Sequence, residues 1–153
     1  QLRGAELRTM LCQKFIDAYE YSVDVFKDFD QNIIAAVPRR RIEVRHGEVS
    51  KAVVINCVDI VKDCMLIAKN LSFKGAICVQ LFMTEAGDRL FTEVNMRFGG
   101  GAILSMQAGA DMTGWIVDMV AGFPLPLECE FTSPLFMSRA DREFFCTLTT
   151  CFL

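Results

Sequence analysis

Three side chains that carry oxygen atoms could together hold a metal ion. Gln80 lies in the apolar run 76–83, and Glu93 and Asn95 lie in the run 89–95 that follows a glycine-containing turn. If the two runs pair as a symmetric hairpin, Gln80 lies directly opposite Glu93, and Asn95 points to the same face. One carboxylate and two amides form an oxygen ligand set that suits Mg²⁺ or Mn²⁺. The simpler alternative is that these side chains only solvate an exposed sheet face.

The same register predicts how the rest of the hairpin divides between two faces. Phe82 and Phe91 should lie beside the three acceptors. The other face should pack on helices, because nearly all of its side chains are apolar. With Thr92 as its only polar member, that face should carry Val79, Leu81, Met83, Leu90 and Val94.

A cation and a glycine-rich loop follow the hairpin. Arg97 comes two residues after Asn95, and the glycines at 99–101 lead into the start of an expected helix. Backbone N–H groups at a helix start and an arginine both suit an anion, although three glycines can also do no more than allow a turn. A divalent cation beside an anion-binding loop could hold the phosphates of a nucleotide.

The elements that would position this site mix strands and helices. Alternating and apolar runs predict most of the strands, and a change to helical spacing predicts a helix after residue 58. The expected elements are a helix at 2–10, strands at 11–16, 20–26, 33–37, 42–45 and 49–57, a helix at 59–70, the hairpin at 76–95, and two short helices after 101, the second capped by Asp111. The fold class expected is therefore α+β, an antiparallel sheet with flanking helices in a single domain.

Composition restricts the setting in which such a site works. The net charge of -3 argues against broad binding to nucleic acid or to anionic lipid. No apolar run approaches the roughly 18 residues of a membrane span. We therefore expect a cytoplasmic location and no membrane partner. The 7 cysteines form no CxxC pair and lie mostly in apolar stretches, which favours reduced thiols. With His46 as the only histidine, a zinc site of His and Cys is poorly supported.

The runs 79–82 and 91–97 resemble the metal-binding signature of the ATP-grasp ligases, most closely carbamoyl-phosphate synthase large subunits. The resemblance implies ATP and two Mg²⁺ or Mn²⁺ ions as cofactors. It also implies that Gln80 holds one ion, Glu93 bridges both and Asn95 holds the second. Arg97 would then be the catalytic cation, facing the transferred phosphoryl group or the acyl phosphate.

A second stretch resembles the adenine hinge of the same family and the strand after it. On this resemblance the backbone around Lys14, Phe15 and Ile16 pairs with adenine, and Gln13 stands where many members carry Glu. Glu20 would accept hydrogen bonds from the ribose hydroxyls. The alternative, that Glu20 is only a solvated charge at the end of a strand, has equal weight. Four basic side chains follow in the sequence: Arg39, Arg41, Arg45 and Lys51. One or two of them would meet phosphate or the substrate carboxylate, and Lys51 is the one assigned to ATP.

The resemblance covers roughly residues 10–125, which in the family form the C-terminal lobe of the ATP-grasp fold. We therefore expect residues 1–153 to be one partial domain that lacks the pre-ATP domain and the flap lobe, and that is inactive alone. In such ligases a carboxylate or bicarbonate attacks the γ-phosphate of ATP, and an amine or ammonia then displaces phosphate from the acyl phosphate. The alternatives are a non-catalytic nucleotide-binding or structural domain and an unrelated antiparallel domain. Oligomeric state stays open, with a homodimer considered.

Overall fold

The computed structural model describes residues 12–140, so the helix expected at 2–10 lies outside the described residues. The chain forms six strands and three helices in this range: β1 (Tyr19–Lys27), β2 (Ile33–Arg45), β3 (Glu48–Val54), α2 (Val58–Lys69), β4 (Gly75–Met83), β5 (Arg89–Asn95), α3 (Ala102–Gln107), α4 (Met112–Ala121) and β6 (Leu135–Ser138). None of these helices has the length and apolar character needed to cross a membrane.

The six strands form one antiparallel sheet in the order β5-β4-β1-β2-β3-β6. The first three strands follow one another as a meander, and α2 then returns the chain across the sheet so that β4 pairs with β1. The expected α+β class with an antiparallel sheet and flanking helices is confirmed. The central strand β1 has neighbours on both sides, which makes it the framework of the site described below.

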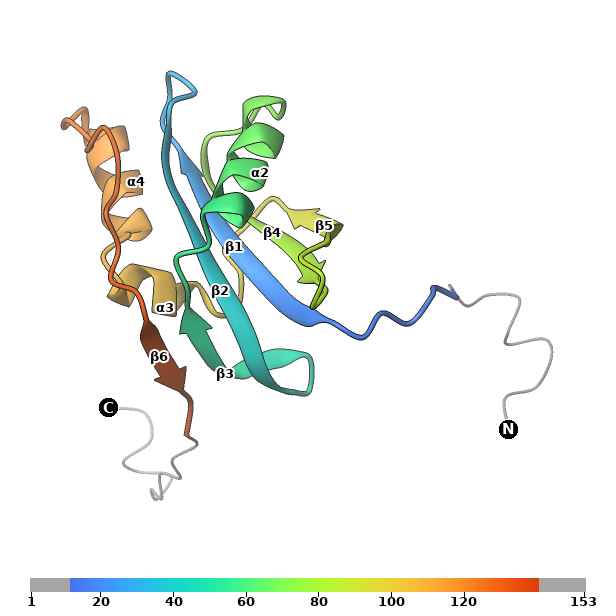
Figure 1. Ribbon diagram of the computed structural model, residues 1–153. Coiled ribbons are helices and arrows are strands. Elements are labelled where there is room, and N and C mark those ends of the chain that lie inside the picture. Colours follow the sequence, from blue (N-terminus) through green and yellow to red (C-terminus); the bar gives the residue numbers. More distant parts are fainter. Residues whose placement is uncertain (1–11, 141–153) are drawn as a thin grey trace, which may run out of the picture.

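Two strand predictions are wrong in detail. Residues 12–17 form no strand, and Phe15 is 86% exposed, because the segment leads away from the end of β1 instead of pairing (Figure 1). The separate strands expected at 33–37 and 42–45 are one strand, β2. Pro38 does not interrupt it, since the backbone of Pro38 fits an extended strand and its carbonyl accepts a hydrogen bond from the N–H of Ile55 over 3.1 Å.

Helices cover both faces of the sheet (Figure 1). The helix α2 buries Ile60, Cys64 and Ala68, spaced four residues apart along one side, against Val23 and Val79 of the sheet. The helical spacing in the sequence placed Val61, Cys64, Met65 and Ala68 on the apolar side of this helix. The structure buries the same side, with Ile60 rather than Val61 as its first buried residue.

The opposite face packs on α3 and α4. Trp115 of α4 meets Phe26 of β1 edge to face, with 5.3 Å between the ring centroids. Asp111 caps α4 as expected, accepting a hydrogen bond from the N–H of Gly114 over 3.0 Å. These helices cover only part of their face, and the uncovered part carries the polar residues of the hairpin.

Candidate functional site

The hairpin pairs at its centre as the sequence predicts. Gln80 of β4 lies directly opposite Glu93 of β5, and Asn95 lies opposite Cys78. The side-chain Nδ2 of Asn95 donates a hydrogen bond to Oε1 of Glu93 over 2.8 Å. The carboxylate and both amides therefore project from the same face of the paired strands.

A β-bulge next to Gln80 changes the rest of the hairpin. The register shifts by one residue between Gln80 and Leu81, so that Phe91 lies opposite Leu81 and Leu90 lies opposite Phe82. The prediction that Phe91 lies beside the acceptors and Leu90 on the opposite face is therefore wrong. The physical reason is that a bulge adds one residue to one strand, and a one-residue shift turns each later side chain to the other face.

The acceptors belong to a polar row that crosses four strands. Glu93 pairs with Gln80, Gln80 with Ser22 of β1, and Ser22 with Arg39 of β2. Residues directly opposite one another in paired strands share a face. The sheet thus aligns a carboxylate, an amide, a hydroxyl and a guanidinium on the face that α3 and α4 leave partly open.

A pocket of about 160 Å³ opens above this row. Its walls come from strands β1 to β5, from the β2–β3 turn and from the loop between β5 and α3. They include Gln80 and Asn95 of the acceptor cluster, whereas Glu93 lies outside the lining. It is lined by Ser22, Arg39, Arg41, Gly47, Glu48, Val49, Cys78, Gln80, Asn95, Arg97 and the glycines 99–101. Two basic residues of the segment 39–51, Arg39 and Arg41, reach the pocket, and Arg45 and Lys51 do not.

A buried ion pair forms the floor of the pocket. Arg39 donates from Nε to Oδ2 of Asp24 over 2.7 Å and from Nη2 to Oδ1 over 3.0 Å, and both side chains are 1% exposed. Ser105 of α3 donates from its hydroxyl to Oδ2 of Asp24 over 2.6 Å. The two-pronged contact fixes the plane of the guanidinium, and the Ser105 hydroxyl adds a third bond to the carboxylate.

Sequence reasoning missed Ser22, Asp24 and Ser105 as parts of this site. The available signal was the alternation of Ser22 and Asp24 with Val23 and Val25, which places both polar residues on one face of a strand. Nothing local to β1 indicates that a helix eighty residues later covers that face.

The glycine loop rests on this ion pair. A Cβ at residue 99 would lie 2.8 Å from Sγ of Cys78 and 3.0 Å from Nη2 of Arg39. A Cβ at residue 101 would overlap Nη1 of Arg39 and lie 2.7 Å from Cγ1 of Val49, whereas a Cβ at residue 100 would meet nothing within 4 Å. Two of the three glycines are thus required by close approach to the pocket floor rather than by flexibility.

The cations around the pocket differ in their pairing. Arg41 pairs with Glu20, and Arg139 pairs with Glu48 over 3.3 Å and also donates to the carbonyl of Gly100. Arg97 makes no ion pair with any carboxylate of residues 12–140, and its Nη1 donates only to the carbonyl of Phe98 over 2.9 Å. Arg97 is therefore the cation whose charge is available to an anion in the pocket.

The remaining predicted ATP residues lie at two other places. Gln13, Lys14 and Phe15 are exposed and Ile16 is half-buried in the segment that leads into β1. Glu20 follows on β1, opposite Phe82 and two residues from Ser22, so it shares the face of the acceptors. The hinge segment and the acceptor row are thus connected by a single strand.

Lys51 lies apart from the pocket. Its Nζ pairs with Oε2 of Glu43 over 2.6 Å, and Arg45 pairs with the same carboxylate over 2.5 Å. The hydrogen bonds from Lys51, and then those from Arg45, lower the pKa of Glu43 to about 2. The expected contact of Lys51 with ATP stays a prediction.

The thiol in the pocket wall is not a nucleophile. Cys78 is 1% exposed, and burial raises the pKa of its thiol to about 11. At neutral pH this thiol is protonated, and a thiolate is the reactive form of cysteine. Burial therefore disfavours the reactive thiolate form of Cys78.

The acceptor set fits a divalent cation of the Mg²⁺ type. Within the described part of the chain no three His, Cys, Asp or Glu side chains cluster, but Mg²⁺ needs only one or two protein carboxylates and takes its other ligands from water and phosphate. Because Asn95 donates from Nδ2 to Glu93, its Oδ1 keeps its lone pairs for a cation. Glu93 provides the negative charge, and Gln80 and Asn95 provide amide oxygens.

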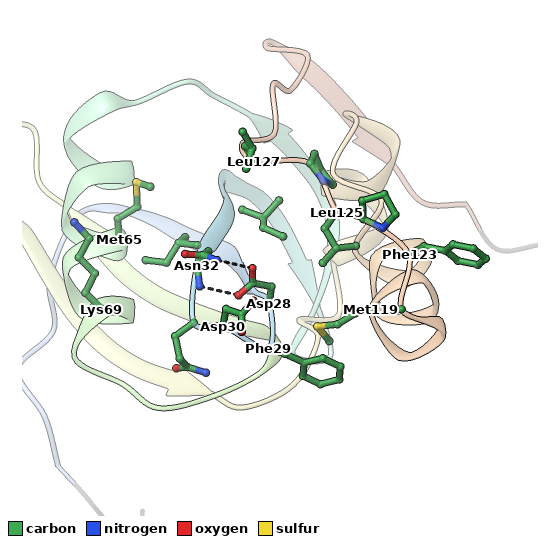
Figure 2. Close-up of a pocket in the computed structure, with 16 residues that line it drawn as sticks. Asp28, Phe29, Asp30, Asn32, Met65, Lys69, Met119, Phe123, Leu125 and Leu127 are labelled. Atoms are coloured by element: carbon green, nitrogen blue, oxygen red, sulfur yellow. Dashed lines mark hydrogen bonds between the residues drawn. The ribbon is translucent and has the colours of Figure 1, made fainter.

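A larger hollow lies elsewhere and contains none of the predicted site residues. It has a volume of about 670 Å³ and lies between the β1–β2 turn, α2 and the loop after α4 (Figure 2). In its wall Asp28 accepts two hydrogen bonds from Asn32, each 2.8 Å long. Size alone does not make this hollow the functional site, because the acceptors and Arg97 lie at the smaller pocket.

Comparisons with known proteins identify the fold. The family model described as ATP-grasp in the biosynthetic pathway with Ter operon matches residues 6–140. No curated protein matches the chain.

Solved structures agree with this match. Among them is N5-carboxyaminoimidazole synthetase from Staphylococcus aureus complexed with ADP, at 19% identity and a TM-score of 0.68 over 82% of this chain and 36% of that one. The biotin carboxylase–β-γ-ATP complex from Campylobacter jejuni matches at 19% identity and a TM-score of 0.64, over 74% of this chain and 28% of that one. The phosphoribosylaminoimidazole carboxylase ATPase subunit from Aquifex aeolicus matches at 14% identity and a TM-score of 0.62, over 75% of this chain and 38% of that one.

The chain spans about a third of the length of these structures. Its sheet and flanking helices form the ATP-grasp lobe that the sequence indicated, and the more specific likeness to carbamoyl-phosphate synthase stays a prediction. With a family model matched over most of its residues, this chain belongs to the ATP-grasp family.

Proposed function

We propose that this chain is the ATP- and Mg²⁺-binding lobe of an ATP-dependent ligase that joins a carboxylate to an amine or ammonia. The observation that carries the proposal is the convergence of Gln80, Glu93 and Asn95 on one sheet face beside Arg97, whose charge is unpaired among residues 12–140. Such a face can hold a cation and the phosphates that bind to it. In this proposal residues 1–153 are one partial domain, and the pre-ATP domain and flap lobe lie in other parts of the full-length protein.

Each predicted site residue has a role in this mechanism. Glu93 and the amide oxygens of Gln80 and Asn95 would hold the two divalent ions of this proposal. Bound there, the ions would neutralise phosphate charge and so favour attack at the γ-phosphorus. Arg97 offsets the negative charge that develops on the transferred phosphoryl oxygens.

The other end of the nucleotide lies along the entry to β1. The backbone of residues 14–16, with Gln13 before it, pairs with the adenine edge, and Glu20 accepts hydrogen bonds from the ribose hydroxyls. The connection of this segment to the acceptor row through one strand supports the assignment. Lys51 is the weakest member of the set, because Glu43 already neutralises its charge.

The reaction that follows is a transfer in two steps. A carboxylate or bicarbonate oxygen bonds to the γ-phosphorus as the bond to the β-phosphate oxygen breaks, releasing ADP. The nitrogen of an amine or ammonia then bonds to the acyl carbon, and phosphate leaves as the nitrogen loses its proton. The protonated Cys78 is consistent with this route, since no protein nucleophile takes part. A carbamoyl-phosphate synthase-like choice of bicarbonate and ammonia is one member of this class.

A non-catalytic nucleotide-binding domain is the second candidate. It is favoured by one feature, the presence of a single carboxylate among the three acceptors, because fewer charged ligands bind a divalent cation less tightly. Such a domain would bind ATP without turning it over.

ADP formation by the full-length protein tests the proposal. We expect ADP release that needs Mg²⁺ and rises with one of a panel of small carboxylic acids or bicarbonate. Glu93→Gln should abolish it, and Glu128→Gln should not, because Glu128 is exposed and outside the pocket. ATP binding without any turnover would favour the non-catalytic domain. Unchanged turnover in Glu93→Gln would refute the metal assignment.

A further inference from the structure

We propose that Asp24 and Arg39 are positioning residues for Arg97, acting through the glycine loop that joins β5 to α3. Neither Asp24 nor Ser105 belongs to the acceptor set, and neither is exposed enough to meet the nucleotide. The proposal rests on the function proposed above for Arg97. It assigns to the buried ion pair the task of holding that cation in place.

The ion pair touches the loop directly. The guanidinium of Arg39 lies against Gly99 through Nη2 and against Gly101 through Nη1, so closely that neither residue has room for a methyl group. Asp24 fixes this guanidinium with two hydrogen bonds. Since a guanidinium held by two parallel bonds cannot rotate freely, it presents a rigid surface to the loop.

The end of the loop is tied to the same carboxylate. Ser105 lies in the first turns of α3 and donates to Asp24 over 2.6 Å. Asp24 therefore connects β1, β2 and α3 at one point. From the outer side, Arg139 donates to the carbonyl of Gly100 and so holds the loop against the floor.

Arg97 depends on this support because its own side chain has few contacts. Its side chain donates to the carbonyl of the next residue, Phe98, and is exposed to solvent. The position of its charge is therefore set by the backbone between Asn95 and Gly99. The carbonyl of Asn95 accepts a hydrogen bond from the N–H of Arg97 over 2.8 Å, and beyond it the loop is held by Arg39.

Hydrogen exchange in the full-length protein tests this support without relying on activity. Asp24→Asn should speed the exchange of the amides of residues 97–101 by about tenfold or more, and Ser105→Ala should do so by a smaller factor. Ser105→Ala removes a single hydroxyl, so it keeps the test open if Asp24→Asn does not fold. Lys27→Met is the control, because Lys27 is also buried on β1 but donates to the carbonyl of Leu71 over 2.8 Å, a contact that involves neither the glycine loop nor α3. It should leave the exchange of residues 97–101 unchanged.

A double-mutant cycle tests the effect on catalysis. In the full-length enzyme Asp24→Asn should lower kcat about tenfold with the KM for ATP within about twofold. In an Arg97→Gln background the same change should add less than about twofold, because both changes remove the same contact. Lys27→Met should have equal effects in both backgrounds.

The outcomes separate the two proposals. If the wild type shows no ATP turnover but Asp24→Asn still speeds the exchange of residues 97–101, the positioning role of the ion pair is supported and the ligase function is refuted. Unchanged loop exchange in both Asp24→Asn and Ser105→Ala would overturn the positioning role, whatever the activity. Equal losses of kcat from Asp24→Asn with and without Arg97 would also overturn it, because a general loss of structure acts independently of Arg97.

Discussion

Asn95 donates a hydrogen bond from its amide nitrogen to Oε1 of Glu93 over 2.8 Å, two residues away on the same strand. The bond uses the donor side of the amide and leaves its oxygen free. It also holds the carboxylate of Glu93 toward the face where Gln80 lies. The pair thus presents one charged and one neutral oxygen group in a fixed relation.

Replacement of Asn95 by Ala should therefore affect more than one ligand. It removes an amide oxygen and also releases the Glu93 carboxylate. We expect the Mg²⁺-dependent part of ATP affinity to fall about tenfold or more, measured by calorimetry on the full-length protein. Thr92→Ala, a change of an exposed residue on the same strand, should leave the affinity within about twofold. Equal losses in the two variants would contradict the role of Asn95.

The assignment of Glu20 to the ribose predicts a change in sugar preference. In the proposal Glu20 accepts from the ribose hydroxyls while Arg41 holds its carboxylate in place. Glu20→Gln should lower the affinity for ATP about tenfold and that for 2′-deoxyATP much less. Competition binding with the two nucleotides measures both. A variant that keeps the wild-type preference for ATP would show that Glu20 only solvates the end of the strand.

Close packing predicts different stabilities for neighbouring glycine variants. Gly101→Ala places a methyl group against Arg39 and Val49, and it should lower the free energy of unfolding by about 1–3 kcal/mol. Gly100→Ala meets nothing within 4 Å and should change it by less than about 0.5 kcal/mol. Denaturant unfolding of both variants measures the difference. Similar stabilities would mean that the loop lies farther from the guanidinium.

The pKa of Glu43 predicts an acid-sensitive ion-pair cluster. The hydrogen bonds from Lys51 and Arg45 lower this pKa from 4.5 to about 2. Because the pKa is lower in the folded state, the stabilisation is complete above about pH 4.5 and is lost as the pH falls through about 2. Lys51→Met should raise the pKa toward its usual value, as measured by NMR titration of the Glu43 carboxyl group. An unchanged pKa in this variant would show that Lys51 does not contact Glu43 in solution.

The strand pairing at the centre of the hairpin could be predicted because it depends only on the nearby sequence. Turn position and strand alternation are enough to place Gln80 opposite Glu93, and both are visible in the sequence. The bulge beside Gln80 was not predictable, since no glycine or proline marks it. It reversed the expected positions of Leu90 and Phe91.

The pocket floor required information that no single segment contains. Asp24 and Arg39 meet across the paired strands β1 and β2, and Ser105 reaches them because α3, far along the chain, packs back on the same face. The sequence indicated Arg39 as one of several cations without distinguishing it from Arg45, and it assigned Lys51 to ATP instead. The structure separates them, because only a buried partner such as Asp24 holds a cation beneath the loop, while Glu43 holds the other two at the far end of the β2–β3 hairpin.

The dependence of ATP binding on Mg²⁺ tests the central claim most directly. Calorimetric titration of ATP into the full-length protein, with and without Mg²⁺, compares the wild type with Glu93→Gln. We predict that Mg²⁺ tightens ATP binding to the wild type about tenfold or more, and that the variant loses this gain while its Mg²⁺-free affinity changes by less than about twofold. A Glu93→Gln protein that keeps the full effect of Mg²⁺ would contradict the assignment of this sheet face as the metal–nucleotide site.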